Sequence, residues 1–206
     1  MTIEFDPLED FVVVVGMKKY GKTVITKWLI KQRCRTYVVI DIAHILGDLG
    51  YVVYYPERLE KALNEGVQQI VYQPESGTKE HWDQVFLILK NYGNYTLIID
   101  EIQEFCYGKW YVSDHLRSII TRGRNQKIGL ICNSRRPHLF HKDIRGNADL
   151  VFCFYLHEKN DVKYMAEWFD IEEQEIKQLP KYESILFKVN APTGEKIERL
   201  QPCPLT

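Results

Sequence analysis

The sequence predicts an α/β fold in which helices flank a mainly parallel central β-sheet. Short runs of β-branched and apolar residues recur along the chain, and stretches with apolar residues at helical spacing lie between them. Runs that are apolar throughout are typical of strands buried on both faces, as in parallel sheets. With 206 residues, of which 45% are hydrophobic, the chain is long enough to bury a core as one domain, residues 1–206.

The first predicted strand, Phe11–Val15, is followed by the sequence GMKKYGKT at Gly16–Thr23 and by a predicted helix at Val24–Gln32. The spacing GxxxxGKT between a strand and a helix indicates a phosphate-binding P-loop, because its glycines let successive backbone N–H groups point at one phosphate chain. We expect Lys22 to reach the β- and γ-phosphates and the Thr23 hydroxyl to bind Mg²⁺. The predicted cradle consists of Gly16, Met17, Lys18, Lys19, Tyr20, Gly21, Lys22 and Thr23.

The next part of the chain contains further strands and one helix. Runs of β-forming residues predict strands at Thr36–Ile40, Tyr51–Tyr55 and Gln68–Tyr72. Apolar side chains at helical spacing predict a helix over His81–Lys90. Asp41, at the end of the first of these strands, either caps a helix or helps to order Mg²⁺ or the nucleophile.

Another predicted strand, Thr96–Ile99, ends in two adjacent carboxylates, Asp100 and Glu101. Open α/β sheets bind ligands at the carboxyl ends of their strands, and the P-loop opens at that same edge. We therefore expect Asp100 to hold Mg²⁺ through water and Glu101 to polarise the water that attacks the γ-phosphate. The alternative is a pair of acids that cap a helix after the strand.

The extra strands between Lys22 and Asp100 favour P-loop enzymes that insert a strand between the P-loop strand and the Mg²⁺-binding strand and use a catalytic glutamate. Guanine-specific GTPases fit poorly, because the nearest string to their base-reading NKxD sequence, Glu158–Asp161, does not match it. Small-molecule kinases fit less well, because they need no glutamate directly after the Mg²⁺-binding aspartate.

The second half of the chain continues the alternation. Ser113 is placed to cap a helix that runs to about Arg122, and apolar runs predict strands at Ile128–Cys132 and Leu150–Leu156. The end of the chain differs, because two short runs flank a turn and predict a terminal β-hairpin at about residues 184–200. Its parts are Ser184–Val189, the turn Ala191–Gly194 and Lys196–Leu200.

The region Thr121–Phe140 reads TRGRNQKIGLICNSRRPHLF, and the string NADL follows at Asn147–Leu150. This region resembles the corresponding part of the FtsK/HerA superfamily of DNA-pumping ATPases. The shared order of features is a helix, GR, a strand, a polar residue, RP and then an NAD turn into another strand. Within that superfamily, the chain is most similar to the genome-packaging ATPases of turreted icosahedral archaeal viruses. The resemblance covers Phe11 to about Asn190, and it implies a RecA-like fold with an additional strand, a catalytic glutamate and ATP as substrate.

The resemblance also implies roles for further residues. In this superfamily a polar residue, commonly the Gln of a QRP string, senses the γ-phosphate. Alignment on Pro137 places Arg135 where that Gln is expected, so Asn133 and Arg135 are alternative sensors. An arginine of one subunit commonly reaches the γ-phosphate of its neighbour. Arg122 and Arg124 are the candidates here, and their alternative role is pairing with the helix dipole.

The implied activity is ATP hydrolysis that drives double-stranded viral DNA into a preformed capsid. It implies a homo-oligomeric ring, partners at a capsid vertex or among membrane-associated viral proteins, and a location in the host cytoplasm or on the virion. One alternative is another NTPase with the same site, of FtsK/HerA type or a plasmid-partition or helicase-loading ATPase. A second is a nucleotide-gated binding module, against which Glu101 argues, because a pure switch has less need of a general base.

The net charge is −1, but basic residues cluster. Seven Lys and Arg and no acid lie between residues 18 and 35, and eight lie between residues 117 and 145 against Asp143 alone. Such segments indicate surfaces for polyanions, or alternatively solvated helix faces. Nearby aromatic residues such as Trp110 and Tyr111 are expected to pack, with base stacking as the alternative. The loop expected to contact a duplex backbone consists of Arg135, Arg136, His138 and Lys142.

The N-terminal region shows no targeting pattern. The N-terminal residues are acidic and lack the apolar region of a signal peptide, and no apolar run approaches the ~18 residues of a membrane helix. We therefore expect an unexported chain without a transmembrane segment. The five cysteines lack CxxC spacing, so buried reduced thiols are expected.

Overall fold

The computed structural model describes residues 3–75, 77–192 and 194–201, and a large β-sheet organises them. Its strands are β1 (Phe11–Val15), β2 (Tyr37–Ile40), β3 (Tyr51–Val53), β4 (Gln69–Tyr72), β5 (Tyr95–Ile99), β8 (Ile128–Ser134), β9 (Leu150–Cys153), β10 (Ser184–Lys188) and β11 (Ile197–Leu200). Within the described residues the sheet has nine strands in the order β11-β10-β9-β1-β8-β5-β2-β4-β3. Neighbours from β3 to β9 are parallel, whereas β10 and β11 are antiparallel additions at one edge.

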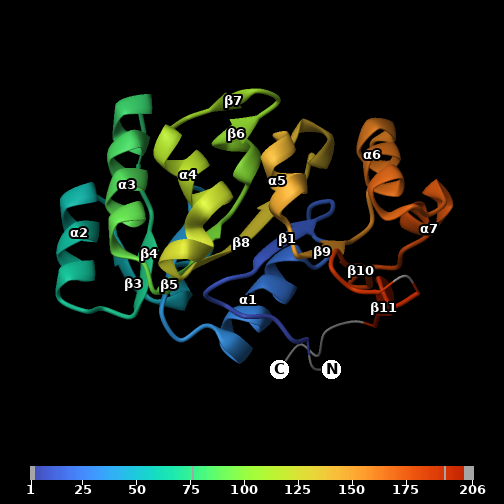
Figure 1. Cartoon of the computed structure of the whole chain (residues 1–206), viewed down its shortest axis with the longest axis horizontal. Helices are drawn as coiled ribbons and strands as arrows, with labels where there is room; N and C mark the ends of the chain where they lie inside the picture. The colour runs from blue at the N-terminus through green and yellow to red at the C-terminus, as the bar shows by residue number, and fades with distance from the viewer. Residues whose placement is uncertain (1–2, 76, 193, 202–206) are drawn as a thin grey trace.

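Helices cover both faces of the sheet, and most of them lie on one face (Figure 1). They are α1 (Lys22–Arg33), α2 (Pro56–Asn64), α3 (Lys79–Tyr92), α4 (Asp114–Arg122), α5 (Lys142–Asn147), α6 (Lys159–Phe169) and α7 (Glu173–Lys177). A separate two-stranded hairpin, β6 (Cys106–Tyr107) and β7 (Trp110–Tyr111), lies between β5 and α4 in the chain.

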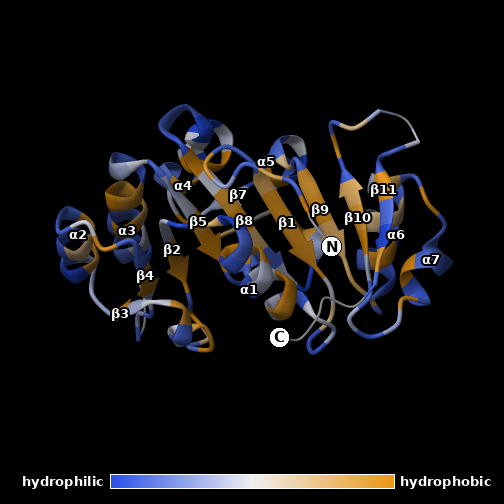
Figure 2. Cartoon of the chain, turned by 90° about the horizontal axis from the view of Figure 1, so that it is seen from below, coloured by the Kyte–Doolittle hydropathy of each residue, from blue (hydrophilic) through white to orange (hydrophobic). Residues whose placement is uncertain are grey.

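The sheet separates two apolar cores. Val12 and Val14 of β1 pack with Leu29 of α1 on one face. Val13 belongs to the other core, which includes Phe86 of α3 and residues of α2 and α4 to α7. Because successive strand residues point to opposite faces, a strand with helices on both sides must be apolar throughout. Figure 2 shows this as mostly orange strands in the middle of the sheet.

The fold class that the sequence predicts is confirmed, including the terminal hairpin formed by β10 and β11. The turn predicted at residues 191–194 includes Thr193, which lies outside the described residues. Helix α4 starts where the capping pattern predicts, because the Ser113 hydroxyl accepts the His115 N–H at 3.0 Å.

Two strands are shorter than their apolar runs predict. Strand β3 ends at Val53, because Pro56 is the first residue of α2 and Tyr55 precedes it in extended conformation. Strand β9 ends at Cys153, and the apolar residues 154–156 continue as irregular chain that packs beside the P-loop. Phe154 packs against the two P-loop glycines, whereas Leu156 belongs to the core that includes Phe86.

The strand order positions the predicted site. Strand β8 lies between β1 and β5, so one strand separates the P-loop strand from the strand that ends before Asp100. The register pairs Val15 with Ser134, and Ile99 with Cys132. The carboxyl ends of β1, β8 and β5 therefore lie at one edge of the sheet, where open α/β folds bind ligands.

No helix in the described part of the chain is long and apolar enough to span a membrane. Four cysteines are buried and unpaired, and burial raises the pKa of Cys34 to about 11 and that of Cys106 to about 12. These thiols stay protonated at neutral pH. The fifth, Cys203, lies outside the described residues.

Candidate nucleotide-binding site

The loop Gly16–Gly21 requires glycine at both ends. Gly16 and Gly21 have φ angles of 153° and 123°, which side-chain-bearing residues rarely adopt. A Cβ atom at either position would also lie 2.6 Å or 2.8 Å from side-chain atoms of Phe154. The Met17 N–H donates to the Tyr155 carbonyl at 2.9 Å, so the segment after β9 holds the loop in place. The two glycines therefore allow a tightly curled loop against a fixed neighbour.

Helix α1 starts directly after this loop without a cap of its own. No side chain accepts its first N–H groups, and its first turn contains no acidic residue. Such a helix start leaves backbone donors and the positive end of the helix dipole for an anion. The geometry is that of a phosphate-binding helix start.

Lys22 is 8% exposed and donates from Nζ to the carbonyls of Gly16 at 2.8 Å and Met17 at 3.2 Å. Burial lowers the pKa of Lys22, and the nearby carboxylates of Glu101 and Asp100 oppose that shift. The ammonium is thus pre-positioned inside the loop, held by two neutral acceptors that a charged phosphate can replace.

Asp100 belongs to a buried polar network that joins three elements. Asn133, at the end of β8, donates from Nδ2 to Asp100 Oδ1 at 3.0 Å, and Thr26 of α1 donates to Asn133 Oδ1 at 2.9 Å. Asp100 is 6% exposed, and burial raises its pKa, with the Asn133 hydrogen bond opposing the shift. Both ends of the Asn133 amide are therefore engaged, and this side chain orients Asp100.

Glu101 occupies the left-handed backbone region, with φ 57° and ψ 58°. A non-glycine residue in this conformation costs about 1–3 kcal/mol and persists where its surroundings hold it. The Glu101 side chain is also held, because Oε1 lies 2.6 Å from Arg135 Nε and Oε2 accepts from Gln103 Nε2 at 2.6 Å. Arg135 therefore contacts the carboxylate that the DE motif predicts to be the general base.

These residues converge on a cleft of about 720 Å³. The P-loop, Asp100, Glu101 and Arg135 line it, as the motifs predict. Five cationic side chains of the lining face three carboxylates, which favours a polyanionic ligand. The cations are Lys18, Lys19, Lys22, Arg135 and Lys181, and the acids are Asp100, Glu101 and Glu104.

Two walls of the cleft come from residues that the sequence motifs do not include. One is the loop after β2, with Ile42, Ala43 and Ile45, and the other is Lys181 and Tyr182 before β10. The buried Asp41 carboxylate shapes the first wall by accepting the N–H groups of Ile45 and Leu46. The short 3₁₀ helix that follows, Gly47–Leu49, has no side-chain cap, so Asp41 orders the loop and does not cap that helix as predicted. Neither wall carries a recognisable motif, and both lie far in sequence from the P-loop and from Asp100 and Glu101.

The donor set at this edge fits Mg²⁺. Thr23 and Asp100 both line the cleft and offer one hydroxyl and one carboxylate oxygen. Magnesium binds few protein oxygens and completes its shell with water and substrate phosphates. A buried carboxylate with a raised pKa also gains from a nearby cation, because the cation stabilises its charged form.

Several solved structures share this architecture. The genome packaging NTPase B204 of Sulfolobus turreted icosahedral virus 2, in complex with ATP-gammaS, matches 96% of this chain and 99% of its own, with a TM-score of 0.79 and 23% sequence identity. The chain therefore shares the fold of this structure over nearly the whole length of both chains.

Two further structures agree on the fold. B204, the DNA-packaging ATPase from Sulfolobus turreted icosahedral virus, covers 94% of this chain and 98% of its own at 23% identity, with a TM-score of 0.75. VirB4 of Thermoanaerobacter pseudethanolicus covers 98% of this chain and 92% of its own at 9% identity, with a TM-score of 0.64. No family model and no curated protein matches the sequence. At these identities the likeness establishes the fold alone.

The two candidate trans arginines lie away from the chain's own nucleotide cleft. Arg122 ends α4, and Arg124 lies in the 3₁₀ turn that follows, where its guanidinium is 3.4 Å from Asp149. Both side chains are exposed, and neither lines the cleft around Lys22. The structure therefore places both arginines outside the chain's own nucleotide cleft.

The structure changes the interpretation of the basic loop at residues 135–142. Arg135 contacts Glu101, and Arg136 and His138 both contact Asp161, a residue of α6 that is 1% exposed. Lys142 alone among the four predicted DNA contacts has no ion pair within the described residues. The loop is therefore mainly an internal link between the nucleotide cleft and α6.

Proposed function

We propose that this chain is a Mg²⁺-dependent ATPase that drives double-stranded viral DNA into a preformed capsid. The observation that carries the chemistry is the convergence of Lys22, Thr23, Asp100 and Glu101 on one cleft at the carboxyl edge of the parallel sheet. The fold of genome-packaging NTPases supports the task.

Lys22 and the start of α1 bind the phosphates. The Nζ atom moves from the carbonyls of Gly16 and Met17 to the β- and γ-phosphate oxygens, which are stronger, charged acceptors. Thr23 and Asp100 hold Mg²⁺, which neutralises charge on the phosphates, and Asn133 keeps Asp100 in orientation. Tyr182 is the aromatic residue of the cleft lining and offers a stacking face to the nucleotide base.

Glu101 accepts the proton of the attacking water, and Arg135 controls its orientation. The ion pair with Arg135 holds one carboxylate oxygen of Glu101 in place at the cleft. Arg135 also lines the cleft and is 47% exposed, so a γ-phosphate competes with Glu101 for its guanidinium. We therefore assign γ-phosphate sensing to Arg135 and a positioning role to Asn133.

The working form is a ring of identical subunits, each a single domain of residues 1–206, with Arg122 or Arg124 completing a neighbour's site. Its partners are duplex DNA and capsid-vertex or membrane-associated viral proteins, in the host cytoplasm or on the virion. The alternatives are another NTPase of FtsK/HerA, partition or loader type, and a nucleotide-gated binding module.

Two variants test the chemistry. Lys22→Ala removes the phosphate ligand, so it should lose both nucleotide binding and turnover. Glu101→Gln keeps the shape of the side chain but not its basicity, so it should bind ATP and lose turnover by about 10²-fold or more. Nucleotide binding by a fluorescent analogue and phosphate release measure the two effects. Turnover of Glu101→Gln at the wild-type rate would refute the assigned base.

A further inference from the structure

A second cleft, of about 890 Å³, lies on the sheet face that carries α2 to α7. The β6–β7 hairpin, α4, the start of α5 and Tyr164 of α6 surround it, and Figure 1 shows these elements grouped together. It shares no lining residue with the nucleotide cleft. The Gly108 N–H donates to the Leu139 carbonyl at 3.0 Å, so the hairpin is attached to the loop that follows β8.

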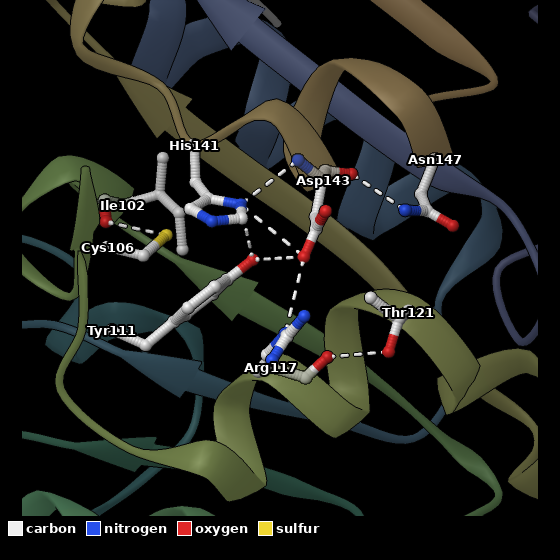
Figure 3. Close-up of polar contacts among 8 residues, drawn as sticks. All are labelled: Ile102, Cys106, Tyr111, Arg117, Thr121, His141, Asp143 and Asn147. Carbon is white, nitrogen blue, oxygen red and sulfur yellow. Dashed lines mark hydrogen bonds and ion pairs between the residues drawn. The ribbon is translucent and has the colours of Figure 1, made fainter. Parts of the chain in front are cut away.

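The floor of this cleft is a polar network that fixes three elements together (Figure 3). Tyr111 Oη of β7 lies 3.0 Å from His141 Nδ1 and donates to Asp143 Oδ2 at 3.1 Å. Arg117 of α4 lies 3.6 Å from the same carboxylate oxygen. His141 is only 5% exposed, and its ring packs on Tyr111 with centroids 4.4 Å apart. The cleft is therefore pre-formed.

The walls combine cations with aromatic surfaces. Lys109 of the hairpin and Lys142 of α5 are exposed, and neither has an ion pair within the described residues. The Arg145 guanidinium lies 5.7 Å and 5.5 Å from the rings of Tyr164 and Trp168. Asp114 is the single acid among the described lining residues, and the Asp143 carboxylate beneath them is held by Tyr111 and Arg117. The cleft is thus a positive surface on a protein whose net charge is −1.

We propose that this cleft binds the sugar–phosphate backbone of nucleic acid and is the surface with which the chain grips DNA. Phosphates alternate with uncharged sugars along a backbone, which matches cations set between aromatic walls. Lys142 also occupies the first turn of α5, where a cation is unfavourable for the helix, so helix stability does not explain it. The inference rests on the proposed function, because it names where that function's DNA binds.

The test compares two double variants that remove the same charge. Lys109→Ala with Lys142→Ala alters the cleft, and Lys31→Ala with Arg33→Ala alters the exposed end of α1, whose helix covers the opposite face of the sheet. Each pair removes two cations and changes the net charge from −1 to −3. The probe is a labelled DNA duplex of mixed sequence, and its affinity is measured by anisotropy at several salt concentrations.

If both lysines contact phosphates, the cleft variant loses about two units of salt slope, because each contact contributes about 0.9. With a slope of about 0.9, each phosphate contact raises the affinity for DNA about eightfold when the salt concentration falls from 1 M to 0.1 M. Loss of two contacts should therefore lower the affinity at 0.1 M salt by about 60-fold. The α1 variant should change the slope by much less.

Three outcomes would overturn the inference. Equal loss in both pairs means that total charge, and not the cleft, sets the affinity. Wild-type affinity and slope in the cleft variant mean that DNA binds elsewhere, and the cleft is then left to an acidic protein surface. A wild-type protein that hydrolyses ATP but binds no duplex refutes DNA pumping as well, which separates that failure from a failure of the cleft alone.

Discussion

Replacement of Arg135 by alanine tests how the general base is held. The change removes the guanidinium 2.6 Å from Glu101 Oε1 and leaves Gln103 as the remaining contact of that carboxylate. A hydrogen bond to a charged group contributes about 1.5–3 kcal/mol. Arg135 is 47% exposed, so water competes for the contact, and the lower end of that range applies. A loss of about 1.5 kcal/mol corresponds to about a tenfold lower kcat.

The adjacent Arg136 provides a matched control. It has the same 47% exposure, but it contacts the buried Asp161 at 3.2 Å and does not line the nucleotide cleft. Arg136→Ala leaves that buried carboxylate with contacts to His138 alone, so it should lower the melting temperature and preserve kcat. Arg135→Ala should lower kcat and preserve the melting temperature. Phosphate release at saturating ATP and Mg²⁺ and thermal melting measure the two effects.

The assignment of Arg135 fails if Arg135→Ala retains the wild-type kcat. Loss of duplex affinity with unchanged turnover would identify Arg135 as a backbone contact, which is the other role that the sequence allows. An Arg135→Lys variant then separates charge from geometry, because a lysine keeps the charge but has no planar fork to hold the carboxylate.

Two further predictions concern the metal ligand and the subunit interface. Burial raises the pKa of Asp100 above its usual value of 3.8, so the folded chain binds the Asp100 proton more tightly than the unfolded chain does. The free energy of unfolding therefore falls as the pH rises from about 3.8 through the raised pKa of the folded state. Asp100→Asn should therefore raise the melting temperature of the nucleotide-free protein at pH 7 while Mg²⁺-dependent turnover is lost, and an unchanged or lower melting temperature would contradict the burial argument. Arg122→Ala and Glu101→Gln subunits should each be inactive alone and regain turnover when mixed. In the mixture, one type of interface joins an intact Arg122 to an intact Glu101. Full activity of assembled Arg122→Ala alone would place the trans arginine elsewhere.

The sequence predicts the centre of the site because local patterns encode it. The P-loop needs glycines at fixed spacing before a helix, and the pair Asp100 and Glu101 needs only the end of an apolar strand. Both patterns are contiguous in the chain, and both reach the same cleft. The walls formed by Ile42 and Tyr182 are not contiguous with these motifs, and only the strand order brings them together.

The sequence could not predict which residues form ion pairs with the charged side chains of the basic loop. The basic loop suggested four DNA contacts, but a charged residue in the sequence does not reveal its partner. Arg136 is held by Asp161, an acid from α6, a helix that the predicted elements do not include. Helix α6 does have a readable apolar stripe, which includes Val162, Met165 and Phe169, whereas α5 and α7, with six and five residues, are too short to show periodicity.

The sensor residue shows the same limit. Alignment of the RP string leaves Asn133 and Arg135 as alternative candidates, because both follow the apolar core of β8. The side chain of Asn133 is 1% exposed and bonds Thr26 and Asp100, whereas that of Arg135 reaches Glu101 in the cleft. Successive residues of a strand point to opposite faces, but a residue past the strand end follows no such rule.

The most direct test of the account is ATP turnover by the purified chain with and without duplex DNA, at low salt and with Mg²⁺. The account predicts that the wild-type protein hydrolyses ATP, that duplex of any sequence accelerates turnover, and that Glu101→Gln stays inactive under both conditions. Turnover that saturating duplex leaves unchanged would contradict the claim that this site drives DNA movement.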